Sequence, residues 1–152
     1  MDDKLTPKQH AYLENLLTEA DKPPSPGEET YRLGCLACHQ PDGKGLPGIY
    51  PPLAGNPRIT GDKDRLIKIV LHGLSGKLEV GGQTYGSSQL AVQMPPMGGL
   101  DDQQVADVLN YVRKEYGKVD GDGITAEQVA KVRSKHQGRT VPWKVAELEK
   151  DE

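Results

Sequence analysis

The chain has no phenylalanine, one tryptophan and only 35% hydrophobic residues, which is little apolar material for 152 residues. Its mean hydropathy is −0.64. A core built from these side chains alone is thin, because the apolar area that a domain buries has to grow with its length. A large bound apolar group offsets such a shortage, since the hydrophobic gain follows the apolar area removed from water.

Long hydrophobic runs and basic clusters are also missing. The longest apolar stretch, residues 66–74, is interrupted by Lys68 and His72 and is shorter than the roughly 20 residues that span a bilayer. The formal net charge is −3, and no Lys/Arg cluster alternates with aromatic residues. We therefore expect no nucleic-acid partner and no transmembrane segment in this chain. The first residues hold no apolar signal region, so we expect any secretory signal to have been removed, replaced or never part of this piece.

The length suits one domain with an appended segment. One pattern, a small polar residue followed three positions later by Glu or Gln, occurs four times and is typical of a helix start. It predicts helices that begin at Thr6, Ser25, Asp101 and Thr125. A shorter helix is expected over about residues 63–72, a hairpin with its turn at Gly81-Gly82, and a Gly/Pro-rich loop over 40–61. The chain is thus predicted to be mostly helical.

Both cysteines lie in RLGCLACHQPDGKG, residues 32–45, and His39 follows the second one directly. Thiols this close serve as half of a zinc site, as a redox dithiol, or as a covalent anchor for haem. A structural zinc site needs four ligands, and the other histidines stand alone at positions 10, 72 and 136. A thioredoxin-type dithiol follows a strand, whereas a capped helix precedes these thiols, and a disulfide across two residues is strained. The Cys-x-x-Cys-His spacing favours haem attachment, although the short pattern also occurs by chance.

Four blocks carry a resemblance to a known family: TYRLGCLACHQPDGKGLPG, YPPLAGNP, LIKIVLHGLSGKLEVGGQTY and MPPMGGLDDQQVADVLNYVRKEYG. In this order they resemble a class I c-type cytochrome of the bacterial kind, from about residue 28 to 116. The resemblance implies an all-α cytochrome c fold, with three core helices around one haem, Gly/Pro-rich loops and a short hairpin. It also implies a division into an N-terminal helical extension (1–24), a cytochrome c domain (25–117) and a C-terminal helix and tail packing on the core (118–152).

The resemblance also implies a ligand set. One haem c is expected to be bound covalently through Cys35 and Cys38, with His39 as one axial ligand. The carbonyl of Pro51 is expected to accept a hydrogen bond from the other ring nitrogen of His39, which makes the imidazole a better donor. The alternative is that Pro51 only stiffens a turn. The sixth ligand is expected to be Met94, which heads the sequence MPP.

Other residues are assigned to the haem pocket with less direct arguments. Met97 is interpreted as packing near the haem edge, and the reverse assignment of the two methionines stays open because Met adapts to many sites. Leu53 belongs to the loop that resembles the proximal packing loop. Tyr50 and Tyr85 are expected to line the crevice or to bond a propionate, since buried Tyr hydroxyls seek a partner.

Some large side chains are expected to pack between elements. Tyr31 precedes Cys35 by one helical turn and Tyr111 lies in the last core helix, and the resemblance implies that these two helices cross closely. In the mostly polar tail from residue 139 to 152, the expected docking points are Val141, Pro142, Trp143 and Leu148.

The remaining histidines have simpler interpretations. His72 ends a predicted helix, where a histidine caps the helix dipole more often than it binds metal. His10 and His136 are expected to be solvated. For the N-terminal helix, with Tyr12, Leu13, Leu16 and Leu17 on one face, we expect packing on the core, with pairing to another chain or linkage as alternatives.

The function implied by the resemblance is electron transfer between redox proteins in a respiratory chain, in the periplasm or elsewhere outside the cytoplasm, and not catalysis. A second hypothesis makes the chain the cytochrome domain or subunit of a larger enzyme, such as a dehydrogenase or terminal oxidase. A third is a haem sensor or peroxidase, which requires an open or labile sixth position. Potential, partners and oligomeric state do not follow from the sequence.

Overall fold

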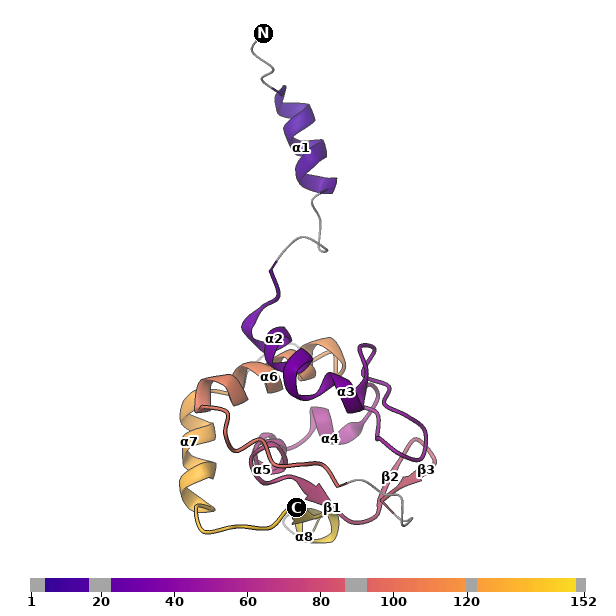
Figure 1. Ribbon diagram of the computed structural model, residues 1–152, viewed down its shortest axis with the longest axis vertical. Coiled ribbons are helices and arrows are strands. Elements are labelled where there is room, and N and C mark those ends of the chain that lie inside the picture. Colours follow the sequence, from indigo (N-terminus) through magenta and orange to yellow (C-terminus); the bar gives the residue numbers. More distant parts are fainter. Residues whose placement is uncertain (1–4, 17–22, 87–92, 120–122, 150–152) are drawn as a thin grey trace.

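The computed structural model describes residues 5–16, 23–86, 93–119 and 123–149 (Figure 1). The helices are α1 (Pro7–Leu16), α2 (Pro26–Gly34), α3 (Leu36–His39), α4 (Pro57–Thr60), α5 (Lys63–His72), α6 (Asp102–Glu115), α7 (Ala126–Lys135) and α8 (Val145–Glu149). The strands are β1 (Leu74–Ser75), β2 (Leu78–Val80), β3 (Gln83–Tyr85) and β4 (Trp143–Lys144). The mostly helical fold predicted from the sequence is therefore confirmed.

The helix boundaries follow the capping residues. Ser25, Asp62, Asp101 and Thr125 each accept a hydrogen bond from a backbone amide of the first turn of the helix that follows. At Asp101 and Thr125 the glutamine three positions later also bonds back to the cap, so two otherwise unpaired amides are satisfied at each site. The region predicted as an irregular loop contains the one-turn helix α4, which Asn56 caps.

Helices α2 and α6 cross at close range beside the candidate site (Figure 1). The crossing depends on Gly27, because a Cβ atom there would collide with the backbone carbonyl of Asp107. Next to it, the buried ring of Tyr31 lies 5.6 Å from that of Tyr111 and 5.4 Å from that of Tyr116. One glycine and a group of aromatic rings thus fix the end of α2 from which the cysteines follow.

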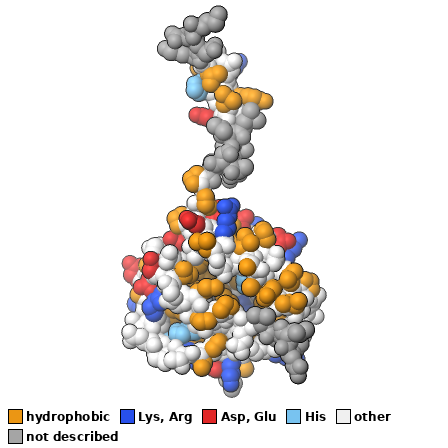
Figure 2. All heavy atoms as spheres, in the orientation of Figure 1, with side chains coloured by type: hydrophobic (Ala, Val, Ile, Leu, Met, Phe, Trp, Pro, Cys, Tyr) orange, Lys and Arg blue, Asp and Glu red, His pale blue; other side chains and the backbone are white. Residues whose placement is uncertain are grey.

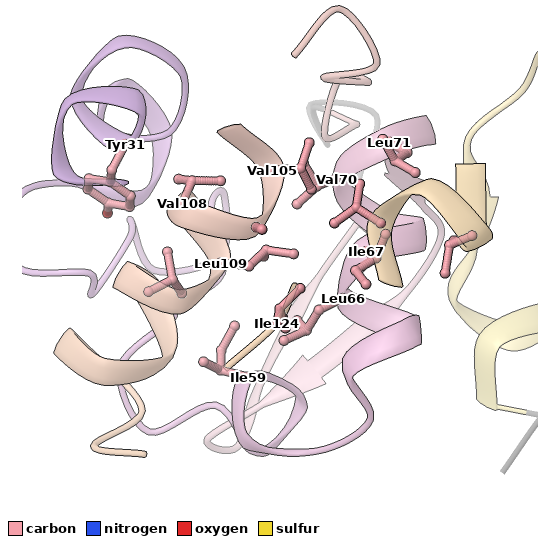
Figure 3. Close-up of a cluster of buried hydrophobic side chains, with 14 of the residues drawn as sticks. Tyr31, Ile59, Leu66, Ile67, Val70, Leu71, Val105, Val108, Leu109 and Ile124 are labelled. Carbon is pink, nitrogen blue, oxygen red and sulfur yellow. The ribbon is translucent and has the colours of Figure 1, made fainter. Parts of the chain in front are cut away.

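The main core is assembled from α2, α4, α5, α6 and α7, and Figure 3 shows its side chains converging between them. Its labelled members in Figure 3 are Tyr31, Ile59, Leu66, Ile67, Val70, Leu71, Val105, Val108, Leu109 and Ile124. Val129 and Val132 of α7 belong to the same cluster. Helix α7 therefore contributes to the core and contacts both α5 and α6.

After α7 the chain returns across the molecule and adds a strand. β4 pairs in parallel with β1, with Trp143 opposite Leu74, and the antiparallel pair β2–β3 forms the predicted hairpin. Trp143 is 7% exposed and packs with Ile69 and Leu148. Neither β4 nor α8 was predicted, although Trp143 and Leu148 are buried as expected of docking points of the tail. The same expectation was wrong for Val141, which is 59% exposed.

His136 is half-buried, contrary to the sequence-based expectation that it is solvated. Its ring lies edge-on to Trp143 at 5.0 Å, and its Nε2 is buried with no hydrogen-bond partner among the described residues. Burial, together with the charges of Lys68 and Lys135, lowers the pKa of His136. The reason is that α7 ends at this residue, so the returning chain covers the ring.

The N-terminal helix α1 stands apart from the rest of the molecule (Figure 1). Tyr12 is 65% exposed and Leu13 is exposed as well, so the expected packing of this face on the core is not observed. The side chain of Leu16 and all of Leu17 lie outside the described residues. In the described part of the chain, no helix has the length and apolar character needed to cross a bilayer.

Candidate functional site

A cavity of about 330 Å³ opens between α3, the hairpin and residues 93–97. Residues from four parts of the chain line it: Gly34, Cys35, Cys38, His39, Ile49, Tyr50, Pro51, Leu74, Ser75, Gly76, Leu78, Tyr85, Gly86, Gln93, Met94, Pro95 and Met97. Most are apolar, and Figure 2 shows hydrophobic side chains gathered over the middle of the main body on the face that it displays. The cavity therefore suits a large apolar ligand with a few polar contacts.

The two thiols lie on one helical turn. Cys35 is the cap residue between α2 and α3, and Cys38 follows three residues later in α3. Both side chains therefore lie on the same side of that turn. Both are free thiols and half-buried. Burial, reinforced by the neighbouring Cys38, raises the pKa of Cys35 to about 11.

This environment disfavours two of the three thiol chemistries. A redox dithiol depends on a lowered thiol pKa, which is the opposite of what burial does to Cys35. A zinc site needs four ligands close together, and the described residues contain no group of three or more Cys, His, Asp or Glu side chains placed to hold a metal ion. The remaining chemistry is the third one, in which both thiols form covalent bonds to carbon atoms of a bound group.

His39 lies beside the thiols with its ring fixed. Its Nδ1 is 2.9 Å from the carbonyl oxygen of Pro51, and since a carbonyl only accepts, Nδ1–H is the donor. Burial lowers the pKa of His39, which favours the neutral imidazole. A neutral ring that donates from Nδ1 keeps the lone pair of Nε2 for a metal. The predicted hydrogen bond between His39 and Pro51 is thus present.

The loop after His39 turns back on itself to bring Pro51 into place. The amide of Gly45 donates to the carbonyl of His39 at 3.0 Å, and the amide of Leu53 donates to that of Gly43 at 2.7 Å. Gly45 has φ +62°, and a Cβ atom there would collide with the carbonyl of Tyr50. A glycine at this position is therefore a condition for the His39–Pro51 contact.

Two tyrosines secure the start of the same loop. The hydroxyl of Tyr31 donates to the carbonyl of Gln40 at 2.7 Å, and the hydroxyl of Tyr116 donates to that of Pro41 at 2.9 Å. Burial raises the pKa of Tyr31 to about 12 and raises that of Tyr116 as well. Tyr31 was predicted to lie at the helix crossing, whereas the part that Tyr116 plays was missed, because its partner is 75 residues away.

Both candidate methionines line the cavity. Met94 forms an antiparallel bridge with Leu74, with N–O distances of 3.0 and 3.2 Å, and the amide of Met97 donates to the carbonyl of Val70 at 2.7 Å. Gly73, at φ +84°, permits this approach, since a Cβ atom there would collide with the carbonyl of Met94. Two thioethers are thus available in addition to the imidazole.

The other expected pocket residues divide into two groups. Tyr50 and Tyr85 line the cavity, but Leu53 is not among its lining residues and packs against the main core instead. Leu78 lines the cavity and was placed in the hairpin by its alternation, yet its contact with the cavity was not predicted. Leu74 was missed because its strand is only two residues long.

His72 and His10 lie away from the cavity. His72 ends α5, as predicted, and its ring lies edge-on to Trp143 at 6.3 Å. Burial and the charges of Arg139 and Arg133 lower the pKa of His72. His10 is exposed on α1. Of the four histidines, only His39 lines the cavity.

The donor set fits a haem that is attached through two thioether bonds. Two free thiols on one turn, a neutral imidazole with an available Nε2 and thioether sulfurs border one apolar cavity. The profile of the family described as cytochrome c matches residues 24–115, which is more than half of the chain. The chain belongs to the cytochrome c family.

Curated relatives in this family are of two kinds. Cytochrome c-552 of Thermus thermophilus is 38% identical over 109 residues, covering 66% of this chain and 79% of the relative. The cytochrome c subunit of a quinone alcohol dehydrogenase from Gluconacetobacter polyoxogenes is 36% identical over 121 residues, covering 78% of this chain and 25% of the relative. The cytochrome c subunit of gluconate 2-dehydrogenase from Pantoea cypripedii is 38% identical over 122 residues, covering 74% and 26%. The chain thus spans most of the first relative and about a quarter of the other two.

Membership of the cytochrome c family settles the cofactor and the general activity. The cofactor is haem c, attached covalently through Cys35 and Cys38, and the chain functions in electron transfer. The haem also supplies apolar surface that the protein sequence has little of.

Proposed function

We propose that this cytochrome c is a one-electron carrier that works outside the cytoplasm, in a respiratory chain, with His39 and Met94 as axial ligands of its iron. The observation that carries this proposal is the cavity that has the fixed imidazole of His39 and the sulfur-bearing segment from Met94 to Met97 among its walls. When bound, haem supplies an iron that changes between the ferric and ferrous states by one electron.

The protein's own residues set the conditions for that exchange. The Pro51 carbonyl holds the His39 ring in one tautomer, which makes Nε2 a better donor. A thioether ligand raises the potential above that of a bis-histidine site. The apolar lining limits water around the ligands, which keeps both oxidation states in nearly the same surroundings.

Contact with redox partners is proposed to occur beside the cavity. Ile49 lines the cavity and is nevertheless 45% exposed, and Leu46 in the same loop is also exposed. A small surface of this type suits brief encounters that bury little area, with the net charge of −3 contributing to partner selection.

The choice between Met94 and Met97 is tested by replacing each with leucine, which changes volume little. In the holoprotein, Met94→Leu is expected to abolish the long-wavelength absorption band that a methionine–iron bond gives in the ferric state, and to lower the reduction potential. Met97→Leu, the matched control, is expected to keep the band. Loss of the band in Met97→Leu alone would exchange the two assignments. A wild-type protein without the band that binds carbon monoxide rapidly in the ferrous state would instead indicate a sensor or peroxidase.

A second function is favoured by the similarity to cytochrome c subunits of two dehydrogenases, which extends over about three quarters of this chain. In this alternative, the chain relays electrons within a larger enzyme, and the exposed residues Tyr12 and Leu13 of α1 lie at the attachment point. Native purification from the source organism tests it. A stoichiometric complex with an oxidoreductase chain would support the subunit, whereas a monomeric haem protein would support the free carrier.

A further inference from the structure

The segment that carries Met94 is fastened at several points. We call residues 94–100 the methionine loop. At its first residue, Met94 bridges to Leu74, and in its middle, the amide of Met97 donates to the carbonyl of Val70 at 2.7 Å. These contacts connect the loop to α5 and β1, which lie inside the region matched by the cytochrome c family. They hold the beginning and the middle of the loop but not its end.

At the end of the methionine loop, the side chain of Leu100 packs against the main core, and two backbone carbonyls accept hydrogen bonds from one side chain of α7, Arg133. Its Nη1 donates to the carbonyl of Gly98 at 2.9 Å and its Nη2 to that of Leu100 at 2.7 Å. Its Nε donates to the Oδ1 of Asp102, at the start of α6, at 2.8 Å. The planar guanidinium can satisfy three acceptors at once, which a lysine ammonium on a flexible stem does not reproduce.

Arg133 reaches the loop from a rigid position. It lies in the last turn of α7, one residue after the buried Val132, and α7 is anchored in the core through Val129. The family profile matches residues 24–115, so α7 lies outside the matched range. Movement of the loop away from the cavity therefore has to break bonds to a helix that is itself fixed.

We propose that Arg133 is a positioning residue that keeps the methionine loop closed over the haem cavity and so sets how readily the Met94–iron bond is broken. This inference rests on the proposed function, because it takes Met94 as the ligand. The carbonyls of Gly98 and Leu100 lie four and six residues after Met94, so release of the end of the loop gives the thioether room to leave the cavity.

The test compares three variants in the holoprotein. Arg133→Gln removes the charge and the fork of donors, Arg133→Lys keeps the charge alone, and Lys131→Gln removes an exposed charge from the same helix as a matched control. Two readouts are used at a temperature well below unfolding: the rate at which imidazole replaces methionine on the ferric iron, and hydrogen exchange at the amides of Met97 and Leu100.

Imidazole is expected to bind about tenfold faster to Arg133→Gln than to the wild type, because the variant lacks the hydrogen bonds from a charged donor. Exchange at the two amides is expected to accelerate with it. Arg133→Lys should be intermediate, and Lys131→Gln should match the wild type. A general loss of thermal stability in Arg133→Gln, with both rates unchanged, would overturn the inference and leave Arg133 a purely structural residue.

The two proposals fail in distinguishable ways. If the wild-type ferric spectrum lacks the methionine–iron band, or if Met94→Leu keeps it, the ligand assignment fails and the inference about that bond fails with it. If the band depends on Met94 but imidazole binding does not depend on Arg133, only the inference fails.

Discussion

The two sides of the haem cavity are stabilised by different parts of the chain. On the side of His39, most contacts join residues close in sequence: the ring bonds a carbonyl 12 residues later, and Gly43 and Gly45 close the loop between them. The exception is the hydroxyl of Tyr116, which bonds the carbonyl of Pro41, 75 residues earlier. On the side of the methionines, Arg133 bonds acceptors 31 to 35 residues earlier, and Trp143 supports the strand with which Met94 pairs. The turn that carries the cysteines and the proposed ligand His39 thus depends mainly on local structure, whereas the loop that carries the proposed ligand Met94 depends on the C-terminal segment.

The largest expected effect comes from separating the C-terminal segment from β1. Trp143→Ala removes the ring that packs on Ile69 and Leu148 and that stacks on the Arg139 guanidinium at 3.6 Å. Because truncation of a buried aromatic leaves a cavity, we expect the free energy of unfolding to fall by about 3–5 kcal/mol. Chemical denaturation measures the loss, and Val141→Ala, at a residue that is 59% exposed, is the control with an expected change below about 0.5 kcal/mol.

Hydrogen exchange in the same variant tests whether the methionine side of the cavity opens independently of the histidine side. In Trp143→Ala, the amides of Leu74 and Met94 are expected to exchange faster, while the amide of Leu53, bonded to Gly43, keeps its protection. Equal acceleration at all three amides would mean that the two sides open together, and the comparison would no longer hold.

An intermediate effect is expected on the histidine side from Gly45→Ala. The new Cβ would meet the carbonyl of Tyr50, and φ is +62°. Strain in the left-handed region and overpacking together are expected to cost about 3 kcal/mol of unfolding free energy. The reduction potential is also expected to change, because the Pro51 carbonyl has to move from His39.

Gly48→Ala is the matched control for Gly45→Ala. Its φ is +75°, but a Cβ atom there would have no described neighbour within 4 Å, so only the backbone strain of about 1 kcal/mol is expected. Denaturation and potentiometry on both variants measure the difference. Equal losses, with an unchanged potential in both, would show that crowding at Gly45 does not control the His39–Pro51 contact.

The smallest expected effect is a pH dependence that arises where the C-terminal segment packs against the end of α5. The pKa values of His72 and His136 are lowered by burial against Trp143 and by the nearby charges of Arg139 and Lys68. The unfolded chain then binds protons more readily than the folded one, so stability is complete above the ordinary pKa of about 6.5 and falls as the pH decreases below it.

Thermal unfolding between neutral and mildly acidic pH tests this dependence. His136→Gln is expected to reduce the loss of thermal stability at acidic pH, and His10→Gln, at an exposed residue of α1, is expected to leave the loss unchanged. An identical pH profile for wild type and His136→Gln would exclude His136 as a source of the effect.

The sequence predicted those features that depend on neighbouring residues. Capping at Ser25, Asp62, Asp101 and Thr125 placed the main helices, and the resemblance to class I c-type cytochromes implied the His39–Pro51 contact. These predictions succeeded because caps, turns and adjacent ligands act within a few residues along the chain.

What the sequence did not predict depends on contacts between distant residues. β1 and β4 have two residues each, too few for an alternating pattern, and their pairing joins positions 69 apart. The half-buried position of His136 follows from the return of the chain after α7, and the bonds of Arg133 follow from the position of α7 beside the methionine loop. No local signal specifies either contact. The choice between the two methionines likewise stays a prediction, because both line the cavity.

The hydroxyls of Tyr31 and Tyr116 give the histidine side a further property. Their raised pKa values keep both groups protonated at any physiological pH, so they remain donors to the carbonyls of Gln40 and Pro41 throughout that range. Neither tyrosine then releases a proton when the iron changes its charge. These two hydroxyls therefore add no pH dependence of their own to the reduction potential in that range.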